Sequence, residues 1–151
     1  MLLKLFNIIE AMKSKSYSEL ILLPTRIERI KYLMLYGKIG DKTFGKNRYL
    51  NQMLYRDSFW RDEVRPEIIL RDNGCDLGLK GYEIPDGVDV FVHHINPITV
   101  EDILNRDPKV FDPENLITTV KKTHDIIHYA FTTEGLDDTP IVRRPNDTKL
   151  W

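Results

Sequence analysis

The chain has 151 residues, of which 42% are hydrophobic and 30% are charged, and its formal net charge is −1 at pH 7. These values are typical of one globular domain with a modest core, and no apolar run is long enough to cross a bilayer, so we expect no membrane partner. Cys75 is the single cysteine, which excludes an internal disulfide framework and favours a reducing compartment, so we expect a cytoplasmic protein. The opening segment Met1–Met12 is apolar but contains Lys4, Asn7 and Glu10, and no small-residue cleavage site follows it, so we expect no signal peptide.

The charge is distributed unevenly along the chain. Residues 1–61 contain 12 Lys and Arg against 5 Asp and Glu, whereas residues 62–151 contain 10 against 18. Such an asymmetry suggests a basic part that contacts phosphates and an acidic part that has a different role. The alternative is solvated surface charge that is sorted by chance.

Two helices are expected in the first part of the chain. Apolar residues from Leu2 to Met12 recur at helical spacing and predict an amphipathic first helix. A second helix is expected to begin at Pro24-Thr25 and to stop at Gly37, with Ile27, Ile30 and Met34 on one face. Three basic residues lie outside that face and could either contact phosphates or only keep the helix soluble: Arg26, Arg29 and Lys31.

The segment from Gly40 to Asn47 nearly matches the phosphate-binding loop of nucleotide hydrolases. The true motif ends in Ser or Thr, whose hydroxyl binds magnesium, but Asn47 stands there, and the preceding helix leaves no room for the required strand. We therefore expect no nucleotide cofactor and interpret the segment as a turn-rich connection. Its basic residues suit contacts to a DNA backbone: Lys42, Lys46 and Arg48.

Further helices are expected before the middle of the chain. The pattern predicts a helix over Arg48 to Tyr55, and then a helix capped by Ser58 that buries Trp60 and Val64. Pro66 predicts a kink or a restart in this helix, and Asn73-Gly74 predicts its end.

The four histidines of the chain all lie between Val90 and Tyr129. His93 and His94 close an alternating segment, Val88 to Ile95, that predicts a strand, so their side chains point to opposite faces. His124 and His128 are four residues apart in a predicted helix, Lys121 to Ala130, and can bind one ion from one face. Between these elements we expect a short capped helix over Thr99 to Arg106 and a second strand over Leu116 to Val120, and after them an extended tail.

This pattern resembles the HNH endonucleases, whose active site is a two-stranded hairpin and one helix around a divalent ion, the ββα-metal motif. The resemblance covers about residues 59–129 and rests on the His93-His94 pair, the run Asn115-Leu116-Ile117, and the closing His124 and His128, which are spaced from the Asn as in nuclease-type colicins. The segments Arg48–Gln52 and Arg71-Asp72 also resemble small phage-encoded members, for which the location would be the host cytoplasm.

The resemblance implies an enzyme that hydrolyses DNA phosphodiester bonds and leaves 5′ phosphate and 3′ hydroxyl ends. It assigns His93, His124 and His128 to one divalent ion (Mg, Mn, Zn or Ni), His94 to the role of general base, and Asn115 to the orientation of His94. It also places Arg65 and Arg71 where they could reach a phosphate. The competing hypothesis is a DNA-binding or phage assembly factor that retains the metal site without cutting.

Many HNH proteins also hold a structural zinc ion with two Cys-x-x-Cys pairs. Here Cys75 is present, but Gly78, Val120 and Thr123 stand at the other three positions, so a zinc site cannot form, and we expect packing alone to hold the hairpin.

The expected architecture is therefore an α+β fold with a mainly helical N-terminal half followed by a ββα-metal (HNH) motif. It divides into a basic helical, DNA-contacting region (residues 1–57), a nuclease core (58–130) and an extended C-terminal tail (131–151).

Overall fold

The computed structural model describes residues 14–36, 47–79 and 82–136. The expected helix over Leu2–Met12, most of the Gly40–Asn47 connection with Lys42 and Lys46, and the tail beyond residue 136 lie outside these ranges, as does the Arg48 side chain. In the described ranges the chain combines helices with two small antiparallel sheets, which confirms the α+β class.

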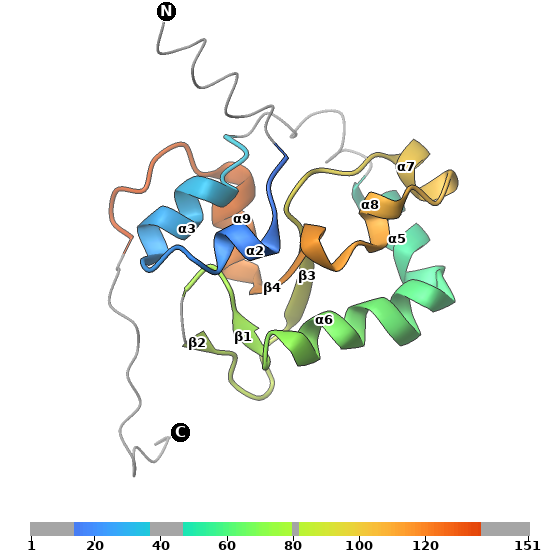
Figure 1. Ribbon diagram of the computed structural model, residues 1–151, viewed down its shortest axis with the longest axis horizontal. Coiled ribbons are helices and arrows are strands. Elements are labelled where there is room, and N and C mark those ends of the chain that lie inside the picture. Colours follow the sequence, from blue (N-terminus) through green and yellow to red (C-terminus); the bar gives the residue numbers. More distant parts are fainter. Residues whose placement is uncertain (1–13, 37–46, 80–81, 137–151) are drawn as a thin grey trace, which may run out of the picture.

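Helices lie on both sides of the sheet that β3 and β4 form (Figure 1). The first half contains α2 (Tyr17–Leu20), α3 (Arg26–Leu33), α5 (Asn47–Arg56), the π-helix η1 (Trp60–Val64) and α6 (Arg65–Arg71). The second half contains β1 (Cys75–Asp76), β2 (Tyr82–Glu83), β3 (Val90–His94), α7 (Val100–Leu104), α8 (Pro108–Phe111), the 3-10 helix η2 (Pro113–Asn115), β4 (Leu116–Val120) and α9 (Lys121–Tyr129).

The central sheet is formed by β3 and β4. The two strands are antiparallel, and His93 pairs with Ile117 while His94 pairs with Leu116. The strand predicted over Leu116 to Val120 is confirmed at both ends, and the first strand is shorter than predicted, ending at His94. The helix predicted after β4 begins at Lys121 and ends one residue earlier than predicted.

A hydrophobic cluster lies on each face of this sheet. In Figure 1, α2, α3 and α9 lie on one side and α5 to α8 on the other. The cluster on the side of α2, α3 and α9 consists of Leu20, Ile30, Leu33, Met34, Ile95, Ile117 and Ile127. The cluster on the other side consists of Leu54, Trp60, Val64, Ile68, Ile103, Val110 and Leu116. Residues on both sides of the expected 57/58 boundary therefore share each cluster.

The helix α3 is well capped but shorter than expected. The Thr25 side chain accepts from the backbone N–H of Glu28, and the Glu28 carboxylate accepts from the N–H of Thr25, which forms a capping box. The helix ends at Leu33 rather than continuing to Gly37, because Met34 already has an extended backbone.

Arg29 in α3 does not face solvent, contrary to the interpretation of it as a possible phosphate contact. Its side chain is only 4% exposed and donates to the carbonyl oxygens of Leu23 (2.8 Å) and Leu77 (2.9 Å). A buried guanidinium is stabilised by such acceptors, so Arg29 joins α3 to the chain that follows β1.

The helix pair before the first sheet differs from the prediction at its start, and of the kink or restart predicted at Pro66 the restart is absent. Asp57, not Ser58, provides the cap, because its carboxylate accepts from the N–H of Trp60 at 2.9 Å. The chain does not restart at Pro66 but passes directly from the π-helix into α6. The wider π turn, in which Arg65 N–H donates to Trp60 O, suits a proline ring that would clash with a carbonyl in the preceding turn of a regular helix.

Two buried carboxylates hold the hairpin, so the expectation of packing alone is wrong. Asp76 is 1% exposed and accepts from Gly78 N–H (2.8 Å), Val120 N–H (3.3 Å) and the Thr123 hydroxyl (2.5 Å). Its three donors come from the three positions where a zinc site would have needed cysteines.

The second carboxylate belongs to Asp72, which accepts from Thr118 N–H at 2.8 Å and from Arg71 Nε at 2.8 Å. Hydrogen bonds to a buried charge are stronger than neutral ones. The carboxylates of Asp72 and Asp76 therefore connect the end of α6 and β1 to β4 and α9.

Candidate metal centre

Three histidine side chains converge between β3 and α9. His93, His124 and His128 each offer one ring nitrogen, and these three atoms lie within 4.8 Å of one another. The His93 ring stands edge-on to the other two, with centroid distances of 5.3 Å to His124 and 5.1 Å to His128. Two nitrogens bound to one ion at about 2.1 Å each are at most about 4.2 Å apart, so small side-chain rotations are enough to form a coordination sphere.

The local structure explains why these rings meet. On β3, side chains alternate between the faces, and Phe91 and His93 point toward α9, where Phe91 stacks on His124 at 5.5 Å. On α9, residues four apart share one face, so His124 and His128 lie side by side at 4.3 Å. The strand prediction and the helix prediction are both needed to bring the three together, and both are confirmed.

The electrostatics of this cluster favour neutral imidazoles. Burial is the main cause that lowers the pKa of all three rings, to about 4 for His128 and well below the ordinary value of 6.5 for His93. The positive charges that the neighbouring rings would carry lower the pKa of His93 further. A neutral imidazole has a free lone pair, which is the form that binds a metal ion.

His93 also carries an unsatisfied polar atom. Its side chain is 4% exposed, and its Nε2 atom has no hydrogen-bond partner within the described part of the chain. Buried polar atoms almost always have a partner, and an exception calls for an explanation such as an ion. The donor set, burial and protonation state thus fit a divalent cation with imidazole preference, such as Zn²⁺, and are less suited to Mg²⁺.

His94 lies on the opposite face of the same strand. Its ring stacks on Trp60, with centroids 5.3 Å apart and an angle of 16° between the planes, and its Nε2 atom is 2.9 Å from the carbonyl oxygen of Val110. Because a carbonyl only accepts, Nε2 must carry the hydrogen, which leaves the lone pair on Nδ1. Burial lowers the pKa of His94 to about 4, and the hydrogen bond to Val110 acts in the other direction.

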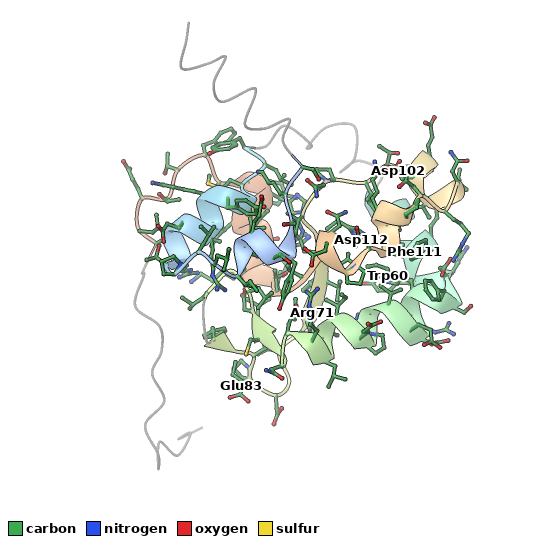
Figure 2. All side chains as sticks on the ribbon, in the orientation of Figure 1. Trp60, Arg71, Glu83, Asp102, Phe111 and Asp112 are labelled. Atoms are coloured by element: carbon green, nitrogen blue, oxygen red, sulfur yellow. The ribbon has the colours of Figure 1, made fainter. Side chains whose placement is uncertain are left out.

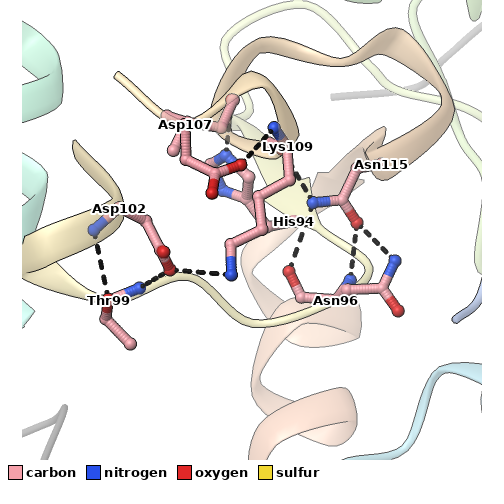
Figure 3. A network of polar contacts seen from close by, with 8 residues as sticks. His94, Asn96, Thr99, Asp102, Asp107, Lys109 and Asn115 are labelled. Carbon is pink, nitrogen blue, oxygen red and sulfur yellow. Dashed lines mark hydrogen bonds and ion pairs between the residues drawn. The ribbon is translucent and has the colours of Figure 1, made fainter. Parts of the chain in front are cut away.

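Asn115 connects the two ends of the insert between the strands, as Figure 3 shows. Its Nδ2 donates to Lys109 O at 2.9 Å, and its Oδ1 accepts from the backbone N–H and from the side-chain amide of Asn96, each at 2.7 Å. These bonds connect the insert to the residues just after β3, and the contact with Lys109 lies one residue away from Val110, whose carbonyl contacts His94.

The remaining residues that the sequence assigned to the site have other contacts. Arg71 donates to Pro113 O and Leu116 O, each at 2.7 Å, and its guanidinium lies 3.6 Å from the centre of the Tyr17 ring (Figure 2). Arg65 donates to Val90 O at 2.9 Å. Both arginines thus support the hairpin from α6.

The acidic residues of the insert cap its short helices. Asp102 forms a capping box with Thr99 and an ion pair with Lys109 at 3.0 Å, and Asp112 caps η2 (Figures 2 and 3). Within residues 14–36, 47–79 and 82–136, the three histidines form the single group of His, Cys, Asp or Glu that is close enough for a metal ion.

Sequence reasoning missed Asn96, Val110 and Asp76. Asn96 follows the predicted strand and belongs to none of the motif positions, and Val110 acts through its backbone carbonyl, which no side-chain pattern reveals. The sequence does contain one signal for Asp76. This carboxylate lies between Cys75 and Gly78, the two positions of a Cys-x-x-Cys pair that lacks its second cysteine.

Comparison of this chain with family models, curated proteins and solved structures finds no match. None of the helices in the described ranges has the length and apolar character needed to cross a bilayer.

Proposed function

We propose that this protein is a metal-dependent endonuclease of the HNH type that hydrolyses phosphodiester bonds of DNA. One observation carries the proposal: His93 and His94 leave β3 on opposite faces, one toward two further imidazoles and the other toward a carbonyl that leaves its Nδ1 free to accept a proton. A purely structural metal site has no use for the second histidine.

The residues would divide the chemistry between them. His93, His124 and His128 would hold the ion, which, when bound, would supply charge stabilisation for the phosphate and the leaving oxygen. His94 would take a proton from the attacking water at Nδ1, while Val110 O keeps the hydrogen on Nε2. Asn115 would fix the α8 turn that presents this carbonyl.

The basic N-terminal part would contribute to DNA binding through exposed side chains. Arg29 is not among them, because it is buried. Lys31 in α3 and Arg56 in α5 are exposed, and contacts of such residues to phosphates would add affinity without sequence preference.

One observation favours the alternative, a DNA-binding or assembly factor that retains the metal site without cutting. The His94 ring is packed against Trp60, and a pKa of about 4 makes it a weak base at neutral pH. Approach of a phosphate anion would raise that pKa, because a nearby negative charge favours the protonated ring.

Nicking of supercoiled plasmid separates the two functions. The wild-type protein and the His94→Ala variant are each incubated with Mg²⁺, Mn²⁺ or Zn²⁺, and metal affinity is measured on the same preparations by calorimetry. We expect the variant to bind metal as the wild type does and to lose cleavage by roughly 10²-fold to 10⁴-fold, as removal of a general base does.

The exposed residue Glu101 on the insert offers a matched control. Glu101→Gln is expected to cleave as the wild type does, which excludes a general effect of substitution in this region, while loss of cleavage in His94→Ala purified in the same way excludes a contaminating nuclease. If wild type and His94→Ala bind metal equally and both leave the DNA intact, the non-catalytic alternative is correct.

A further inference from the structure

Asn96 joins three segments that are distant in the sequence. It lies two residues after the end of β3, and its side chain bonds to the backbone of Lys15 in both directions: Lys15 N–H donates to Asn96 Oδ1 at 2.9 Å, and Asn96 Nδ2 donates to Lys15 O at 2.7 Å. The same Nδ2 donates to Asn115 Oδ1 at 2.7 Å. Both polar atoms of this half-buried amide are therefore used, and its orientation is determined by the Lys15 backbone.

The Asn96 side chain contributes to the orientation of Asn115. Asn115 is 4% exposed, and its Oδ1 accepts one hydrogen from the backbone N–H of Asn96 and one from the Asn96 side-chain amide. A rotation of the Asn115 amide by half a turn would place its NH₂ group against these donors, which is unfavourable. With Oδ1 held in this way, Nδ2 donates to Lys109 O at 2.9 Å and to the backbone carbonyl of Asn96 at 3.3 Å.

The contact with Lys109 defines the position of the α8 turn. Asn115 holds it from the inside, and on the outside the Lys109 ammonium pairs with Asp102 at 3.0 Å, while the Lys109 N–H donates to Asp107 at 3.0 Å (Figure 3). The next residue is Val110, whose carbonyl oxygen lies 2.9 Å from His94 Nε2. A change in the Asn115 amide is thus transmitted through one peptide unit to the partner of His94.

We propose that Asn96 is a positioning residue for His94. Through Asn115 and the α8 turn it keeps the Val110 carbonyl aligned with Nε2, and so keeps the Nδ1 atom free of hydrogen. The catalytic meaning of this arrangement rests on the proposed function, in which His94 Nδ1 accepts a proton from water.

The test uses Asn96→Asp and Asn96→Ala in the full-length chain, with two readouts. Asn96→Asp keeps the shape and the acceptor for Lys15 N–H but replaces the donor to Asn115 with a second oxygen, and Asn96→Ala removes the amide altogether. The first readout is the tautomer of His94, taken from long-range ¹H–¹⁵N correlation spectra at pH 7.5. The second is the single-turnover cleavage rate on a labelled DNA duplex with Mn²⁺, together with Mn²⁺ affinity.

We expect wild-type His94 to carry its hydrogen on Nε2 and the variants to show a mixture of the two tautomers. The cleavage rate should fall roughly threefold to tenfold, the effect of weakening one hydrogen bond, while metal affinity stays within about twofold because the three metal-facing rings lie across the strand.

Ser18→Ala is the matched control. The Ser18 hydroxyl donates to Glu114 at 2.9 Å and also ties the N-terminal segment to the insert, but it contacts neither Asn96 nor Asn115 in the described structure. If the Asn96 variants act merely by loosening this segment, Ser18→Ala will change the tautomer and the rate in the same way, and the proposal is overturned.

The proposal is also overturned if His94 keeps the Nε2 hydrogen alone in both variants, or if an enzyme that cleaves DNA keeps its full rate in both. Should the wild type fail to cleave, the proposed function fails, and the tautomer still decides whether Asn96 positions His94.

Discussion

A methyl group added at Gly78 is expected to destabilise the protein in a way that a second substitution repairs. Gly78 is buried where the chain leaves β1, and a Cβ atom there would lie 2.4 Å from Thr123 Cγ2 and 3.1 Å from Asp76 Oδ1. Thr123 cannot simply rotate away, because its hydroxyl donates to Asp76 at 2.5 Å. Gly78→Ala therefore forces either a backbone shift or the loss of that hydrogen bond.

The structure allows the size of the effect to be worked out. Overpacking of a core costs about 1–3 kcal/mol, and loss of a hydrogen bond to a buried charge costs about 1.5–3 kcal/mol. The reduced entropy of the unfolded chain returns about 0.4–1 kcal/mol. We expect Gly78→Ala to lower the free energy of unfolding by about 1–2.5 kcal/mol, or the Tm by roughly 2–10 °C for a chain of this size.

Thr123→Ser supplies the repair because serine keeps the hydroxyl and lacks Cγ2. Alone, this substitution should cost about 1 kcal/mol for the lost methyl group. Combined with Gly78→Ala, it removes the clash, so the double variant should be more stable than Gly78→Ala alone, with a coupling of about 1–2 kcal/mol.

Urea denaturation of the four proteins in this cycle, followed by circular dichroism, gives the coupling directly. Additive effects would refute the reasoning, because they would mean that residue 78 does not approach Thr123. Such a coupling would show that the Thr123 methyl group and a side chain at position 78 compete for the same space.

Three further predictions follow from the described contacts. His124→Ala should lower metal affinity at least about 10-fold in calorimetry, and unchanged affinity would show that the ligand set is wrong. Arg71→Met should lower the free energy of unfolding by about 2–4 kcal/mol in urea, because it removes the Arg71 donor to Leu116 O and leaves the buried Asp72 carboxylate with the Thr118 N–H but without its charged partner; the same change at exposed Arg61, whose partner is exposed Asp62, should cost much less. The metal-free protein should lose stability as the pH falls from about 6.5 to about 4, because the pKa of His94 and of His128 is lowered to about 4 and the unfolded chain therefore binds more protons in this window. The slope should approach about 1.4 kcal/mol per pH unit for each histidine, and a flat urea midpoint over this range would contradict it.

Much of the candidate site could be predicted because its residues are set by local spacing. An alternating strand places His93 and His94 on opposite faces, and a helix places His124 and His128 on one face. These rules act within a few residues, so they hold before any tertiary contact is known. The strand over Leu116–Val120 and the capped helix after Thr99 were predicted for the same reason and are confirmed.

The environment of the charged residues could not be predicted in the same way. Arg29 and Arg71 look like surface cations in the sequence, yet one is buried and the other donates to two backbone carbonyls across the fold. Whether a guanidinium meets solvent or a carbonyl depends on which segments pack beside it, and this is decided by contacts between distant parts of the chain.

The sequence by itself determined the strand, the helix and the faces on which four histidines lie, because backbone periodicity converts residue spacing into direction. Only the tertiary structure decided which carbonyl contacts His94, that Asn96 bonds to Asn115, and that Asp76 joins β1 to α9. Those contacts join residues 16 to 47 positions apart, and a hydrogen bond over such a separation exists only when the intervening chain has folded and closed around it.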